Sequence, residues 1–77
     1  MSKIYLKDRQ QLEILLAEKG WNYNTLASRV GIGATYLSRI VNGGAIGRRT
    51  AKLIANEFRK EVPEIFFITS VDKSFTK

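Results

Sequence analysis

A short stretch near the middle of the chain gathers side chains that could read a hydrogen-bonding surface. The stretch VGIGATYLSRIVNGG, residues 30–44, carries Thr35, Tyr36, Ser38 and Arg39 between two pairs of glycines. Arginine offers a planar fork of donors, and the hydroxyl groups of threonine, serine and tyrosine both donate and accept. Such groups suit the edges of nucleic-acid bases, which present fixed patterns of donors and acceptors.

The composition gives little support to catalysis or metal binding. The chain of 77 residues contains no histidine and no cysteine, so it lacks the commonest general base, the thiolate nucleophile and the soft ligands of zinc. Its seven carboxylates lie outside the basic middle of the chain, and no motif pairs them. We therefore expect no enzyme, no cofactor, no metal site and no small-molecule substrate.

The net charge of +6 comes from one part of the chain. Positive and negative side chains balance in residues 1–18 and again in residues 57–77. Residues 19–56 contain neither Asp nor Glu, and such a segment projects an unopposed positive potential that attracts a polyanion. A solvated basic face without a partner is the alternative. The cations of this segment are Lys19, Arg29, Arg39, Arg48, Arg49 and Lys52.

Capping residues predict a series of short helices. Each of the first three has a favourable cap residue at its start and a glycine or asparagine at its end. Apolar residues recur between these caps at the spacing of a helix with one buried side. The framing residues are Asp8 and Gly20, Asn22 and Gly31, and Gly33 and Asn42, followed by a helix from Arg48 to Phe58 and a last turn that Pro63 starts.

The second and third predicted helices form a helix-turn-helix. In this motif a tight turn containing glycine joins two short helices, and the first braces the second so that its outer face enters the major groove. Leu37, Ile40 and Val41 form the expected inner side of the third helix. The outer side then presents Ala34, Thr35, Tyr36, Ser38 and Arg39.

The segment LASRVGIGATYLSRIVNG, residues 26–43, resembles the signature of the lambda-repressor/Cro-type family of helix-turn-helix regulators, also called the xenobiotic response element (XRE) family. The resemblance extends from the first predicted helix to about Phe67. It implies an all-α fold, a compact five-helix domain that binds operator DNA, usually as a dimer. The residues that carry it are Leu26, Ala27, Gly31, Ile32, Leu37, Ser38, Ile40, Asn42 and Gly43.

The resemblance also assigns roles to single side chains. It implies that Ala34, Thr35 and Arg39 read bases, and the chemistry agrees, because arginine can contact guanine O6 and N7 and threonine a thymine methyl group. Tyr36 and Ser38, at the groove margin, complete the predicted base-reading set. The predicted phosphate contacts are Asn22, Tyr23, Asn42, Arg48, Arg49 and Thr50.

We expect one helix-turn-helix domain over residues 1–67, followed by a tail at residues 68–77. The tail could be frayed, or it could form a short strand that docks on a partner. Aromatic and aliphatic residues near the C-terminus cannot all be buried in so short a chain, so some should lie at a dimer or partner interface. This predicted interface set is Ile65, Phe66, Phe67, Ile68 and Phe75.

The leading hypothesis is a Cro-like transcriptional regulator that binds double-stranded operator DNA as a homodimer. The alternative is an antirepressor, modulator or antitoxin that uses the same fold to bind another repressor or a toxin. No apolar run exceeds four residues, which predicts neither a signal peptide nor a membrane span. The absence of cysteine fits a reducing compartment, so we expect the cytoplasm of a bacterial or phage-infected cell, at the nucleoid.

Overall fold

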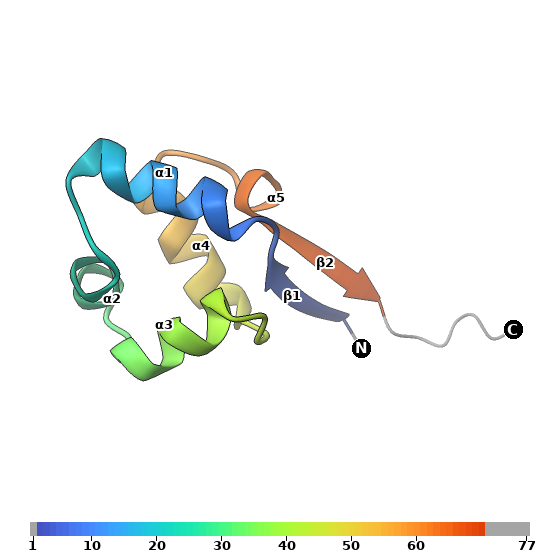
Figure 1. The fold of residues 1–77 in the computed structure, drawn as a ribbon. Helices are drawn as coiled ribbons and strands as arrows, with labels where there is room; N and C mark the ends of the chain where they lie inside the picture. The colour runs from blue at the N-terminus through green and yellow to red at the C-terminus, as the bar shows by residue number, and fades with distance from the viewer. Residues whose placement is uncertain (1, 71–77) are drawn as a thin grey trace, which may run out of the picture.

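The computed structural model describes residues 2–70, whose arrangement is shown in Figure 1. Helices gather into one body, and two strands lie side by side at one end of it (Figure 1). The elements in chain order are β1 (Ser2–Leu6), α1 (Arg9–Lys19), α2 (Tyr23–Val30), α3 (Ala34–Val41), α4 (Arg48–Glu57), α5 (Val62–Ile65) and β2 (Phe66–Ser70).

The predicted capping residues set the ends of the first helices. The Asp8 carboxylate accepts a hydrogen bond from the backbone N–H of Gln10 at 3.0 Å, at the start of α1. The Asn22 side-chain oxygen likewise accepts from the N–H of Thr25 at 2.8 Å and starts α2. Gly31 ends α2 with φ +86°, a left-handed conformation that a residue with a Cβ rarely adopts. Local backbone chemistry therefore explains where these helices begin and end.

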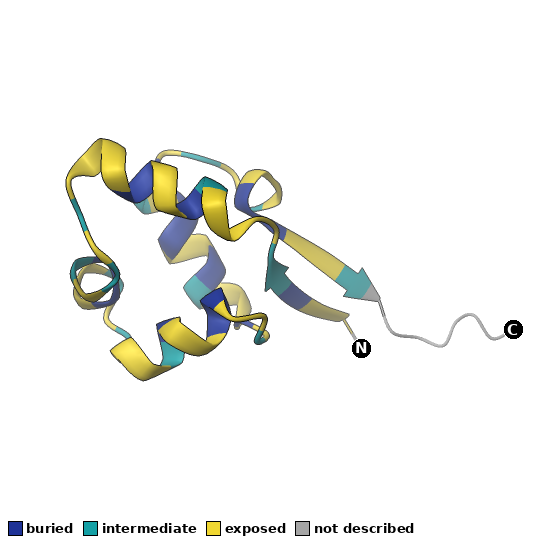
Figure 2. Ribbon diagram, in the orientation of Figure 1, coloured by how far each residue is buried: buried dark blue, intermediate teal, exposed yellow. Residues whose placement is uncertain are grey.

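One hydrophobic core joins all the elements. Figure 2 shows the buried residues on the sides of the helices that face one another. A mostly helical domain of five helices is confirmed for residues 2–70, with the helix-turn-helix at α2 and α3 as predicted. The buried hydrophobic side chains are Ile4, Leu12, Leu15, Leu16, Leu26, Ala27, Leu37, Ile40, Val41, Ile46, Ala51, Ile54, Ala55, Phe58, Ile65 and Phe66.

The small antiparallel sheet was not predicted. It pairs β1 with β2, with Ser2 opposite Ser70 and Leu6 opposite Phe66. The backbone N–H of Ile46 donates to the carbonyl of Ile4 at 2.8 Å, which ties the loop before α4 to the other edge of β1. The sheet thus holds both ends of the described chain against the loop that follows α3.

Two expectations about the C-terminal region need correction. The expected domain boundary after Phe67 falls inside β2, whose residues pair with β1 of the same chain. Ile65 and Phe66 have exposed fractions of 0% and 1%, so their assignment to an interface was wrong. These two side chains complete the core and have no exposed surface of their own for a second chain. Phe75, the last residue of that predicted set, lies outside the described residues.

Candidate nucleic-acid interface

Helix α3 turns its polar side to solvent. Its inner side chains, Leu37, Ile40 and Val41, are buried among the other helices, as the spacing predicted. In Figure 2 the exposed part of α3 lies along the edge of the helical body. A helix anchored in this way is held rigidly while its outer face stays open. Four of the five predicted base-reading residues are exposed on it: Ala34, Thr35, Ser38 and Arg39.

Tyr36, the fifth residue of that set, is half-buried and packs against the core. Its hydroxyl oxygen accepts a hydrogen bond from the backbone N–H of Gly47 at 3.1 Å. Gly47 is the residue before α4, so this bond links α3 to the start of α4. The contact gives Tyr36 a positioning role between these two helices.

A cleft of about 290 Å³ runs along one flank of α3. The predicted phosphate contacts Tyr23 and Asn42 both line it. The cleft also brings in Arg9 and Asn24, which the sequence did not single out. Arg9 lies at the start of α1, before the helix-turn-helix in sequence, and it reaches α3 only because α1 packs beside that helix in the folded chain. The complete lining is Arg9, Tyr23, Asn24, Ala34, Ser38, Val41 and Asn42.

At the start of α2, the two predicted phosphate contacts have partners within the chain. The Asn22 side chain is occupied as the N-cap, accepting from both the N–H and the hydroxyl of Thr25. The Tyr23 hydroxyl donates to Glu13 Oε2 at 3.0 Å. Burial raises the pKa of Tyr23, and the hydrogen bond and negative charge of Glu13 raise it further. A carboxylate therefore lies beside a site predicted to receive a phosphate.

The opposite flank of α3 leads to the start of α4. Arg48 and Arg49 are exposed there, and Thr50 is half-buried. A cleft of about 310 Å³ lies between this helix start and β1, and Lys3 and Arg48 both line it. The first turn of α4 contains two arginines and no acidic residue. Because positive charges at a helix N-terminus oppose the helix dipole, they cost stability, and a bound anion would relieve that cost.

The chain leaves α3 through a turn with strict steric demands. The Asn42 side-chain N–H donates to the carbonyl of Ser38 at 2.8 Å and closes the end of the helix. Gly43 has φ +103°. A Cβ on Gly44 would stand 2.8 Å from the carbonyl oxygen of Arg39, closer than backbone atoms tolerate. The two glycines thus let the chain turn sharply toward β1 without widening the end of α3.

Internal ion pairs show which cations are free. Arg29 Nε lies 2.8 Å from Glu57 Oε1, and its guanidinium lies 4.4 Å from the centre of the Trp21 ring. Arg29 therefore holds α2 to the end of α4 and contributes little open charge. Among residues 2–70, five cations of the acid-free segment have no ion-pair partner: Lys19, which lies over the Trp21 ring, and Arg39, Arg48, Arg49 and Lys52.

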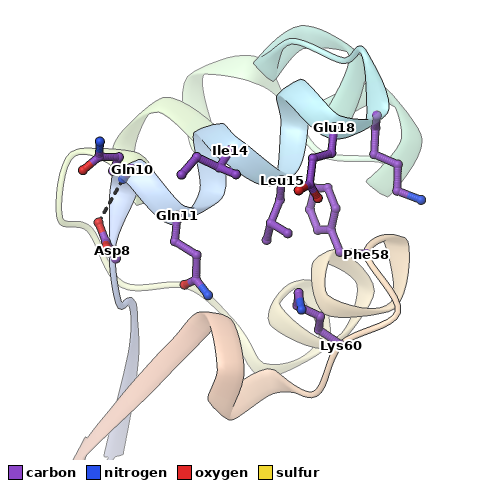
Figure 3. A pocket seen from close by; sticks show the side chains of 9 residues that line it. Asp8, Gln10, Gln11, Ile14, Leu15, Glu18, Phe58 and Lys60 are labelled. Carbon is purple, nitrogen blue, oxygen red and sulfur yellow. Dashed lines mark hydrogen bonds between the residues drawn. The ribbon is translucent and has the colours of Figure 1, made fainter.

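Apolar side chains are exposed on β2 and on α1. Phe67 and Ile68 have exposed fractions of 43% and 60%, and they line a hollow of about 410 Å³ between α5 and β2. Ile14 has an exposed fraction of 54% and borders a separate groove of about 450 Å³ beside α1. Figure 3 shows that groove, with Phe58 and Lys60 on its far side.

Neither a cluster of metal-binding side chains nor a membrane-spanning helix is present in the described part of the chain. No group of three or more acidic residues lies close enough together to hold a metal ion there. No helix between residues 2 and 70 has the length and apolarity to cross a membrane.

Comparison with known proteins identifies the family. A family model described as Helix-turn-helix (HTH_3) matches residues 12–65, most of α1 through α5. No curated protein and no solved structure matched the chain. The matched family is one of DNA-binding regulatory domains, and its match includes α3 with its open polar face. The chain therefore belongs to the XRE-type, lambda-repressor-like helix-turn-helix family of DNA-binding regulators.

Proposed function

We propose that this regulator recognises a specific operator sequence by placing α3 in the major groove, as a Cro-like switch protein does. The observation that carries the proposal is the exposure of Thr35 and Arg39 on a helix whose other side is fixed in the core. Arginine can donate two parallel hydrogen bonds to guanine O6 and N7. Thr35 and Ala34 supply methyl groups for thymine, and Ser38 supplies a hydroxyl for a neighbouring base edge.

Backbone contacts on both flanks of α3 would fix its orientation in the groove. On the α4 flank, Arg48 and Arg49 offer free guanidinium groups, and Thr50 a hydroxyl. On the α2 flank, Asn42 lines the cleft beside α3, together with Tyr23. Contacts to phosphate hold a protein in register on the duplex but carry little sequence information. Tyr36 would act indirectly, by holding α3 and α4 at a fixed separation.

The proposed active form is a homodimer with one α3 in each half-site. Two half-sites on one face of the DNA lie about 34 Å apart, which a two-fold symmetric dimer matches. Phe67 and Ile68 supply the exposed apolar surface for this contact, and no described strand pairs with the outer edge of β2. Unpaired edges with exposed apolar residues are common sites of chain association.

The proposal is tested by a gel-shift measurement with the purified protein alone and DNA from upstream of its own gene. A specific complex that weakens steeply as salt is raised from about 50 mM to 200 mM supports an operator-binding regulator. Equal affinity for the upstream DNA and for a scrambled duplex would contradict it. A DNA-bound regulator would work at the nucleoid of a bacterial or phage-infected cell.

A second candidate function is the binding of another protein, as by an antirepressor, modulator or antitoxin. The specific observation in its favour is the exposed Ile14 beside the groove of Figure 3, which shares no lining residue with the Arg9 cleft. This candidate predicts nanomolar binding to a repressor or toxin and no shift of DNA by the protein alone. The same gel-shift experiment therefore separates the two candidates.

A further inference from the structure

We propose that Arg9 is a DNA-backbone ligand, and that Glu13 competes with the phosphate for it. The inference rests on the proposed function, because it needs a duplex whose major groove holds α3. It adds a contact from α1, a helix outside the helix-turn-helix, and an acidic residue that weakens DNA binding.

The position of Arg9 carries the first step. It is the first residue of α1, yet it lines the cleft beside α3 together with Ser38 and Asn42. Its Nη1 group donates to Asn42 Oδ1 at 3.4 Å, which places the guanidinium at the C-terminal end of α3. A duplex that receives α3 brings its sugar-phosphate backbone past the flanks of that helix. Arg9 is thus within reach of a phosphate while Arg39 faces the bases.

The contact between Arg9 and Asn42 is oriented by a second hydrogen bond. Asn42 Nδ2 donates to the carbonyl of Ser38 at 2.8 Å, so its Oδ1 atom points away from the helix end and toward Arg9. One long hydrogen bond uses only one of the five guanidinium donors. The remaining donors can take a phosphate in a bidentate pair while Asn42 keeps the side chain in place.

Arg9 forms an ion pair with Glu13 one turn along α1. Arg9 Nε lies 3.5 Å from Glu13 Oε2, and the two side chains are 58% and 53% exposed. The same carboxylate oxygen accepts from the Tyr23 hydroxyl at 3.0 Å, which fixes the negative charge beside Arg9 and Tyr23, two residues that line the cleft. A phosphate that approaches Arg9 must therefore displace this carboxylate or bind next to it against charge repulsion. An exposed ion pair of this kind is weak, so a DNA phosphate can replace the Glu13 carboxylate at the Arg9 guanidinium.

The test uses salt titrations with the full chain and a random-sequence duplex of about 30 base pairs, because phosphate contacts do not depend on sequence. Fluorescence anisotropy gives the affinity between about 50 mM and 200 mM salt. Arg9→Gln should lower the slope of log K against log salt by about 0.9, the value for one lost phosphate contact. Arg9→Lys keeps the charge and should restore most of the slope.

A matched control exists elsewhere in the chain. Lys60 pairs with Glu64 at 3.8 Å, four residues along as in the pair of Arg9 with Glu13, and it lines the groove of Figure 3. Lys60→Gln removes the same charge from the protein and should leave the slope unchanged. An equal fall in slope for Lys60→Gln and Arg9→Gln would overturn the proposal, since it would show an effect of net charge alone.

Glu13 is tested separately. Glu13→Gln should strengthen duplex binding by about 1.4-fold to fivefold, the range that corresponds to the release of an exposed ion pair. Glu18→Gln, on the same helix but bordering the groove of Figure 3, should have a smaller effect. The gain in duplex affinity from Glu13→Gln should be smaller in the Arg9→Gln variant than in the wild-type protein. An equal gain in affinity in both proteins would overturn the proposed competition between Glu13 and the phosphate.

The outcomes also separate this inference from the function on which it rests. If the wild-type protein binds no duplex at about 50 mM salt, both are overturned. If it binds with a steep salt slope and Arg9→Gln keeps that slope, the role of Arg9 is overturned and the proposed function stands. A lower slope for Arg9→Gln, with rescue by Arg9→Lys, supports the role of Arg9, and the comparison of upstream with scrambled DNA then decides the proposed function.

Discussion

The backbone N–H of Gly44 donates to the carbonyl of Arg39 at 2.7 Å, and a Cβ on Gly44 would stand 2.8 Å from that same oxygen. The turn after α3 therefore depends on a close approach that only glycine permits. Gly33 differs, because a Cβ there would meet nothing within 4 Å and its φ is −75°. The two glycines that bracket α3 thus have separate roles: half-buried Gly44 permits the close turn after the helix, and exposed Gly33 leaves open space at its start.

We predict that Gly44→Ala destabilises the fold more than Gly33→Ala does. Gly44→Ala should lower the free energy of unfolding by about 1–3 kcal/mol, because the new methyl group forces the backbone apart. Gly33→Ala should cost less, up to about 1 kcal/mol, the difference between glycine and alanine at an N-cap. Urea denaturation followed by circular dichroism measures both. Equal destabilisation by the two substitutions would contradict the steric role of Gly44.

The link between α3 and α4 gives a second prediction. Tyr36→Phe removes the acceptor of the Gly47 N–H and should lower the free energy of unfolding by about 0.5–1.5 kcal/mol. Tyr5→Phe is the matched control, because no hydrogen bond joins the Tyr5 hydroxyl to another described residue. If Tyr36 only positions α3, loss of its hydroxyl should weaken binding to operator DNA and to scrambled DNA to a similar extent. Loss of discrimination at one base pair would instead show that Tyr36 reads that base.

Helix boundaries could be predicted from the sequence because their causes are local. Asp8, Asn22 and Gly31 act on backbone groups a few residues away, and the apolar spacing of α3 fixes which side is buried. The exposure of Thr35 and Arg39 follows from the same spacing. These features need no knowledge of distant parts of the chain.

The sheet and the part of the candidate site that α1 contributes could not be predicted in this way. Pairing of Ser2 with Ser70 joins opposite ends of the described chain, and a short strand has no stable form without its partner. The interface assignment of Phe66 failed for the same reason, since its burial depends on that pairing. Arg9 reaches the cleft beside α3 only through the packing of α1. Each of these features depends on contacts between residues far apart in sequence.

Oligomeric state should depend on Phe67. Phe67→Lys places a charge on the exposed apolar surface of β2 and should raise the dimer dissociation constant by about 30-fold or more, as for a central interface residue. Ile14→Lys changes a residue of similar exposure in the groove of Figure 3 and should leave the association unchanged. Sedimentation equilibrium at several protein concentrations measures both variants. A dimer unaffected by Phe67→Lys, or a wild-type monomer, would contradict the proposed interface.

The contact between Tyr23 and Glu13 predicts a pH dependence at the alkaline end. Burial and Glu13 raise the pKa of Tyr23 above its ordinary value of 10.0, so the folded protein favours the protonated phenol. The resulting stabilisation is complete below the unfolded-state pKa and is lost as pH rises through the higher folded-state pKa. Between roughly pH 8 and pH 11, Tyr23→Phe should therefore lose less stability than the wild-type protein.

Tyrosinate absorbance gives an independent check on the same contact. The difference between the titrations of wild type and Tyr23→Phe isolates the Tyr23 hydroxyl. Glu13→Gln should lower the pKa of that hydroxyl, because it removes a negative charge and weakens the acceptor. A titration of Tyr23 at or below its ordinary pKa in the wild-type protein would contradict the contact.

Replacement of single arginines should separate base reading from backbone binding. Arg39→Ala should reduce discrimination at one base pair of each half-site by about 1–3 kcal/mol. Arg49→Ala should weaken binding to operator and scrambled DNA alike and reduce the salt slope by about one. Affinities measured by anisotropy on both duplexes distinguish the two patterns. If Arg39→Ala lowers the affinity for both duplexes equally, Arg39 does not contact a base.

The most direct test of the central claim is methylation interference on the bound operator. Dimethyl sulfate methylates guanine N7 in the major groove and adenine N3 in the minor groove, so one reaction reports on both grooves. With α3 in the major groove, guanine N7 methylation at one position in each half-site should block the wild-type protein and should have no effect on Arg39→Ala. Interference confined to adenine N3, or identical guanine interference for wild type and Arg39→Ala, would contradict the reading of DNA by the outer face of α3.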